Sequence, residues 1–236
     1  MSLMQPASRQ HSSGGQSAIL ADIVRPIKTT ASLENVSATD FQCGGAPLAL
    51  VIAYVSPYVD FPAVMARLQG RAGKIPLIGV TTAGNLCAAS DADALYLPAE
   101  ENHDDIILQL FPRSLLAAVS LHHIALPNAD IRRGVPFMTH TERVNRIRDA
   151  LRDVTPAFAI DAQDTVALTY VDGLSACENY FMDAVYQSGR FPCMFIGGSA
   201  GGRPDFKHTY MFDGEKVLEN HALVAFFKLQ PDRTYS

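Results

Sequence analysis

The sequence predicts an α/β fold with a mixed sheet built from an internally duplicated β-α-β-β-β unit. Two observations carry this prediction. A continuous apolar run over Leu48–Val55 is typical of a strand that is buried on both faces of a parallel sheet. The same order of strand, helix and strand returns about 117 residues further along the 236-residue chain, which indicates an internal repeat. We therefore expect two related βαβ units in one compact domain.

The first unit continues with a short amphipathic helix over Asp60–Leu68. Asp60 is placed as its N-cap, Pro62 lies in its first turn, and apolar residues recur along one side. Gly70–Lys74 is expected to break this helix. Ile75–Val80 then predicts a second buried strand, parallel to the first.

The second unit repeats this order. Val166–Val171 predicts a strand, Ser175–Gly189 a helix and Cys193–Ile196 the next strand, which ends in a glycine-rich turn. Between the two units, Thr139–Glu142 has the pattern of a capping box and predicts the start of a connecting helix. Each unit is followed by paired strand-like runs, which are Asp105–Phe111 and Ser114–Leu126 in the first half and Lys207–Phe212 and His221–Leu229 in the second.

Composition limits the class of protein. The net charge of −5 argues against a protein that binds duplex nucleic acid through phosphate contacts. The four cysteines form no CxxC pair, as expected of reduced thiols in a cytosolic protein. The longest apolar run is half the length of a membrane helix, and no secretory signal is present, so we expect a cytoplasmic protein. Residues 1–45 are expected to form a partly disordered N-terminal extension, with the tail of about fifteen residues disordered.

A serine hydrolase is the enzymatic alternative. Gly197–Gly201 fits the GxSxG pattern, with Ser199 as nucleophile, and acidic and histidine partners follow in hydrolase order. These partners are Asp205 or Asp213, and then His208 or His221. A nucleophile elbow needs a helix directly behind the serine, however, and here the chain leads into another strand pattern. The predicted function is therefore not enzymatic.

Ligands of parallel sheets bind in the crevice at the carboxyl ends of the strands. This rule selects eight candidate ligand-binding residues, at the ends of three predicted strands and the start of the second helix: Thr81, Thr82, Asp172, Ser175, Glu178, Asn179, Gly198 and Ser199. Ser175 and Glu178 also have the spacing of a reciprocal helix cap, which is the structural alternative for that pair. Cys177 lies at the start of the same helix, and a packed, unreactive thiol is favoured over a reactive one.

The histidines are the candidate ligands for a metal ion or haem iron. His122 and His123 are neighbours in one strand and must point to opposite faces. His208 alternates with Tyr210 and Phe212, whereas His221 alternates with Leu223, Ala225 and Phe227, so both are expected to point inward. If haem binds, we predict His221 as the axial ligand of its iron and His208 as the second choice, because the strand face of His208 is more polar. Buried histidines that are hydrogen-bonded to the backbone are the alternative.

Three segments carry a family resemblance: DGLSACENYFMDAVYQSGRFPCMFIGGSAGG over Asp172–Gly202, IGVTTAGNLCA over Ile78–Ala88 and VLENHALVAFFKL over Val217–Leu229. Together they resemble the N-terminal part of FIST-domain sensory proteins, and the resemblance spans Pro47–Leu229. The first two segments, with AYVSPYVDFP and FDG, are most similar to the nitric-oxide-sensing FIST haemoproteins of the NosP group.

The resemblance implies a sensory domain that binds haem or a small organic ligand such as an amino acid. It also implies that the signal passes to a histidine kinase, a cyclic-di-GMP enzyme or a chemotaxis receptor. FIST proteins ordinarily continue into a C-terminal FIST domain, which we expect to be absent here because the sequence ends at Ser236. No family motif assigns the axial haem ligand, so that choice depends on the strand faces alone.

Overall fold

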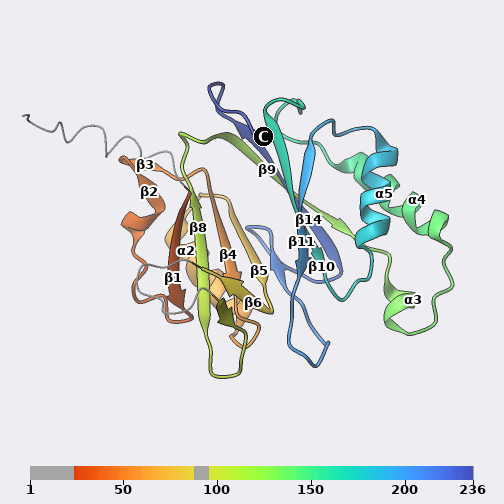
Figure 1. The fold of residues 1–236 in the computed structure, drawn as a ribbon, viewed down its shortest axis with the longest axis horizontal. Helices are drawn as coiled ribbons and strands as arrows, with labels where there is room; N and C mark the ends of the chain where they lie inside the picture. Colours follow the sequence, from red (N-terminus) through yellow and green to blue (C-terminus); the bar gives the residue numbers. More distant parts are fainter. Residues whose placement is uncertain (1–23, 88–95, 236) are drawn as a thin grey trace, which may run out of the picture.

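The computed structural model describes residues 24–87 and 96–235 and has four layers (Figure 1). Two sheets stack face to face, and helices cover their outer faces. One apolar cluster joins helix α2 to the first sheet, a second joins helices α4 and α5 to the second sheet, and a third fills the space between the sheets. The two outer clusters and the central cluster bury both faces of the inner strands, which explains their continuous apolar sequences.

The first sheet has six strands in the order β1-β8-β4-β5-β12-β13. β4 is parallel to β5, and helix α2 connects them, while β8 is antiparallel to β4 on its other side. The bounds are β1 Arg25–Thr30, β4 Leu50–Val55, α2 Phe61–Ala72, β5 Leu77–Thr81, β8 Asp105–Phe111, β12 Met211–Phe212 and β13 Val217–Leu218.

The second sheet has four strands in the order β11-β10-β14-β9. β10 is parallel to β11, with helix α5 between them in sequence, and β14 is antiparallel to β10. The bounds are β9 Leu116–Ala125, β10 Thr165–Asp172, α5 Glu178–Ser188, β11 Met194–Ala200 and β14 His221–Leu229.

The remaining elements are short, apart from the helix that connects the two halves. They are the 3₁₀ helices η1 (Ala38–Phe41) and η2 (Leu151–Asp153), the helices α3 (Ala129–Arg132) and α4 (His140–Ala150), and two small hairpin sheets. The hairpins pair β2 (Gln42–Cys43) with β3 (Ala46–Pro47), and β6 (Gly84–Leu86) with β7 (Tyr96–Pro98).

The predicted mixed α/β class is confirmed. In each sheet a parallel pair is followed by an antiparallel strand next to its first member, so β4 lies between β5 and β8 as β10 lies between β11 and β14. The predicted units are not self-contained, however. β9 of the first half pairs with β14, and β12 of the second half pairs with β5. Superposition of the two halves remains the test of the predicted duplication.

Residues ahead of Leu48 contribute to the fold. β1 pairs with β8 along its whole length, and Leu33, Val36 and Phe41 are buried in the cluster beneath α2. The predicted disordered tail lies outside the described residues. Within the described part of the chain, no helix combines the length and apolar character that crossing a membrane requires.

Three local predictions are settled by the structure. The capping box of Thr139 and Glu142 is present at the start of α4. Helix α2 ends at Ala72, where the C-cap Gly73 adopts φ +64°, so the predicted break within Gly70–Lys74 is confirmed. No disulfide joins the four cysteines, all of which lie in described segments.

Candidate functional site

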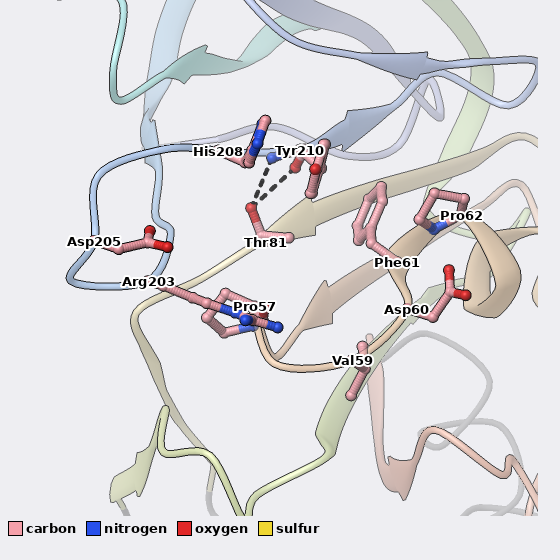
Figure 2. A pocket seen from close by; sticks show the side chains of 10 residues that line it. All are labelled: Pro57, Val59, Asp60, Phe61, Pro62, Thr81, Arg203, Asp205, His208 and Tyr210. Carbon is pink, nitrogen blue, oxygen red and sulfur yellow. Dashed lines mark hydrogen bonds between the residues drawn. The ribbon is translucent and has the colours of Figure 1, made fainter.

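A cavity of ≈ 290 Å³ lies at the carboxyl end of the first parallel pair (Figure 2). Its floor is formed by the loop after β4, the first turn of α2 and the end of β5. A segment of the second half, between β11 and β12, closes it from the other side. The lining residues are Pro57, Val59, Asp60, Phe61, Pro62, Thr81, Arg203, Asp205, His208 and Tyr210.

Three rings form one wall of this first cavity. The rings of Phe61 and Tyr210 stack with centroids 5.8 Å apart. The imidazole of His208 stacks on the other side of Tyr210 at 5.5 Å, and the two planes differ by only 8°. Burial raises the pKa of Tyr210, so its phenol is neutral at physiological pH. The wall is therefore an aromatic stack that also carries the polar atoms of His208 and Tyr210.

Charges of both signs surround the rings. Arg203 donates from Nε to the carbonyl of Pro57 at 2.9 Å, and its guanidinium lies 4.9 Å from the ring centroid of Tyr58. Asp205 accepts the backbone N–H of Lys207 through Oδ1, and Asp60 caps α2 by accepting the N–H of Ala63 through Oδ1. Each carboxylate thus uses one oxygen locally and keeps the second for another donor.

Thr81 fastens the covering segment to the first half. Its hydroxyl accepts the N–H of Tyr210 at 2.9 Å and lies 3.2 Å from the carbonyl of the same residue, as the dashed lines in Figure 2 show. The N–H of Thr81 donates to that carbonyl at 2.9 Å, and Gly201 donates to the carbonyl of Thr81. The predicted residue Thr81 therefore lines the cavity, but its hydroxyl, N–H and carbonyl are all hydrogen-bonded to the covering segment between β11 and β12.

His208 does not point inward from a strand, as was predicted. Only Met211 and Phe212 of the run Lys207–Phe212 pair with a neighbour, so the expected alternation has no strand to support it. The side chain of His208 is 55% exposed, and Nδ1 lies 3.2 Å from Oε1 of Glu219. This contact turns the other ring nitrogen, Nε2, away from the carboxylate.

His221 lies on the face of β14 that fills the space between the sheets, with Leu223, Ala225 and Phe227. Its Nδ1 is 2.6 Å from the carbonyl of Glu219, which matches the alternative of a backbone-bonded histidine. The ring lies 5.5 Å from that of His123, and His123 is 2.9 Å from Asp213. His221 lines neither this cavity nor the one described next.

A second cavity, of ≈ 270 Å³, lies at the carboxyl end of the second parallel pair. It is lined by Thr169, Val171, Glu178, Met182, Phe195, Ile196, Gly197, Gly198 and Ser199. Ser199 donates its hydroxyl to Glu178 at 2.8 Å. The hydroxyl of Thr169 is buried and has no hydrogen-bond partner within the segments described. Three predicted residues, Glu178, Gly198 and Ser199, meet in this second cavity.

The other four predicted residues line neither cavity. Asp172 is buried and accepts hydrogen bonds from the N–H of Leu174, the hydroxyl of Thr209 and the N–H of Asn220. Ser175 is buried and accepts the N–H of Cys177. Thr82 bonds to Asn85, and Asn179 is exposed on α5, according to the contacts and burial of the described residues.

The structure also bears on the predicted helix cap, the Cys177 thiol and the GxSxG serine. Ser175 and Glu178 form no capping box, because α5 begins two residues later than that pattern requires and Glu178 bonds to Ser199 instead. Burial raises the pKa of the Cys177 thiol to about 11, which agrees with an unreactive side chain. The GxSxG serine lies inside β11 rather than at a strand-to-helix turn, and its hydroxyl contacts Glu178 rather than a histidine.

Sequence reasoning missed the charged and aromatic members of the first cavity as a group. Asp60 was identified only as a helix cap, and Tyr210 only as a strand residue. Arg203 was not singled out, although it follows a glycine pair in a segment between strands, where binding residues are common. Its proximity to Asp60 and Phe61 depends on the second half covering the first.

Comparison with protein families gives one match. The model of the FIST N domain matches residues 49–233, which is most of the chain. A search of curated proteins finds no match.

Proposed function

The chain belongs to the FIST N domain family of sensory, ligand-binding domains in signal transduction, and on that premise we propose that it binds a small organic molecule, such as an amino acid, in the first cavity. The ligand would lie between the first turn of α2 and the segment that joins β11 to β12. This role belongs in the cytoplasm, where we expect the protein to act.

One observation carries this proposal: the first cavity combines an aromatic wall with charges of both signs. Phe61 and Tyr210 offer an apolar surface, while the guanidinium of Arg203 suits a carboxylate. Asp205 and Asp60 each have an oxygen that suits an ammonium group. Mostly apolar pockets with a few convergent polar groups are typical of small-molecule sites. The second cavity contains a single charged residue, Glu178.

The position of the cavity suits a sensor. Its two walls come from different halves of the chain, so a ligand that contacts both Asp60 and Arg203 connects the start of α2 with the segment leading to β12. Binding would favour the arrangement in which these two walls are close together. We propose that a separate histidine kinase, cyclic-di-GMP enzyme or chemotaxis receptor reads this change.

Calorimetric titration with the proteinogenic amino acids and small carboxylic acids tests the proposed ligand class. We expect at least one of them to bind, and Arg203→Ala to weaken binding by about 10²-fold through loss of a charge-assisted hydrogen bond. Arg152→Ala is the matched control, because Arg152 pairs with Asp149 on the exposed surface and lines neither cavity. Equal affinity in wild type and Arg203→Ala would contradict this site.

Haem-based sensing of nitric oxide is the second candidate, and the contact between His208 and Glu219 favours it. A carboxylate on Nδ1 orients an imidazole so that Nε2 can bind a metal, and His208 lines a cavity with aromatic walls. The donor fits haem, but ≈ 290 Å³ is at the lower end of organic ligand sites, which start at about 300 Å³. The segment over 201–210 would have to open to admit a porphyrin.

Reconstitution with haem separates the two candidates. A Soret band that shifts with nitric oxide, and that is lost in His208→Ala but kept in His221→Ala, would support haem bound in the first cavity. Loss of the Soret band in His221→Ala alone would support His221, the axial ligand predicted from the strand pattern. The absence of a Soret band, together with measurable binding of an amino acid, would support the small organic ligand over haem.

A further inference from the structure

Strand β11 forms one edge of the second sheet, and no other described strand pairs with its outer side. It is seven residues long, Met194–Ala200, and contains no charged residue and no proline. Met194 is 38% exposed and Ile196 48% exposed, so two large apolar side chains face solvent on an edge strand. An edge of this kind is a template for pairing with another strand.

The other sheet edges are protected in recognised ways. β1 carries Arg25, Pro26 and Lys28, and β13 is only two residues long. β9 is contacted by the segment after η2, since the N–H of Ala157 donates to the hydroxyl of Ser120. Charges, proline, short length and covering segments are the usual means by which natural proteins block an edge. β11 has none of them.

The equivalent edge in the first sheet is covered. β5 occupies the place in its parallel pair that β11 occupies in the second sheet, and β12 pairs with it antiparallel. The space over Gly198 of β11 is open, since a Cβ there would meet nothing within 4 Å. The second sheet thus lacks the antiparallel strand that completes the first.

We propose that β11 of a second copy of this chain supplies that strand, so that two copies form a dimer with a continuous eight-stranded sheet. The absence of charge makes β11 compatible with itself, since self-pairing opposes no like charges. A two-fold axis perpendicular to the sheet gives an isologous contact and keeps each sheet face continuous. Ala200 is buried against the first half, so pairing involves the residues before it.

The sequence of β11 suits a two-fold axis at Ile196. Met194 then lies opposite Gly198 of the second copy, Phe195 lies opposite Gly197, and Ile196 packs on its own copy across the axis. The paired strand would run beside Gly198 and Ser199, along the open side of the second cavity. This dimer does not depend on which ligand binds the first cavity.

Light scattering and sedimentation of the full chain test the proposal. We expect wild type to have twice the 25.6 kDa mass of the chain. Ile196→Lys should raise the dissociation constant about 100-fold, because two ammonium groups would face each other across the axis. Val135→Lys is the control, since Val135 is 69% exposed between α3 and α4.

Gly198→Lys gives a second variant that should fold, because its side chain enters open space. It should also yield monomers with the circular dichroism spectrum of wild type. A wild-type chain that remains monomeric at high concentration would overturn the proposal. So would a folded Ile196→Lys or Gly198→Lys protein that remains dimeric.

Discussion

Gly197 and Gly198 are neighbours in β11, but only Gly197 is required by its surroundings. Gly197 has φ +153°, and a Cβ there would overlap the carbonyl oxygen of Thr169, whereas Gly198 has open space around it. We expect Gly197→Ala to lower the free energy of unfolding by about 2 to 4 kcal/mol, and Gly198→Ala to change it by less than about 0.5 kcal/mol. Urea denaturation of both variants checks this, and equal stabilities would contradict it.

Asp130 and Arg143 form a fully buried ion pair, with 2.7 Å between Oδ2 and Nη2. Asp130→Asn would leave the guanidinium buried without its partner, so we expect the melting temperature to fall by about 10 °C. Asp149→Asn is the control, because Asp149 pairs with Arg152 on the surface, where such pairs contribute little. Equal melting temperatures in the two variants, measured by calorimetry at neutral pH, would show that the buried pair is dispensable.

The same pair gives stability a defined pH dependence. The hydrogen bond from Arg143, helped by those from the backbone of Met138 and Phe137, holds the pKa of Asp130 well below its ordinary value of 3.8. The unfolded chain therefore binds a proton at this carboxyl before the folded chain does. The stabilisation is complete above that ordinary value and is lost as the pH falls below it. Acid unfolding should show a smaller loss below pH 4 in Asp130→Asn than in wild type.

At the scale of elements, the sequence was sufficient where local pattern and tertiary environment agree. β8 and β14 have the predicted bounds, because their apolar runs meet buried surface on both sides. The sequence was insufficient where a contact with a residue far along the chain determines the local structure. Glu178 bonds to Ser199 instead of capping α5, and the run Lys207–Tyr210 covers a cavity instead of forming a strand. Neither contact can be predicted from the hydrophobic periodicity of the segment that makes it.

We expect the 3₁₀ helix η1, near the N-terminal end of the described chain, to contribute to the stability of the fold. Phe41 in η1 is 2% exposed and packs in the cluster beneath α2, although it lies ahead of the matched family domain. Phe41→Ala should lower the free energy of unfolding by about 3 to 5 kcal/mol, because it removes a buried ring and leaves a cavity. Phe137→Ala, with its side chain 71% exposed, is the control. Similar urea midpoints for the two variants would show that η1 is peripheral to the fold.

At the scale of the whole molecule, each half completes the other. The first cavity unites Asp60 with Arg203, and β9 and β12 each pair in the sheet of the opposite half. Sequence reasoning located the strand ends and Thr81, but treated each half as a closed unit. The eight predicted ligand residues divide between the two cavities and four residues that line neither, and the first cavity depends on this exchange of strands, which no single segment encodes.

The hydroxyls of Tyr54 and Tyr170 meet at 2.6 Å where β4 of the first sheet faces β10 of the second. Each tyrosine stands in the first strand of its β-α-β unit, which is an inner strand of its sheet, and burial raises both pKa values, so the pair stays neutral and hydrogen-bonded. A double-mutant cycle with Tyr54→Phe and Tyr170→Phe should give a coupling free energy of about 1 kcal/mol. Tyr186 is 74% exposed on α5, so Tyr54→Phe combined with Tyr186→Phe should be additive. Additivity in the first cycle as well would mean that the two sheets associate through apolar packing alone.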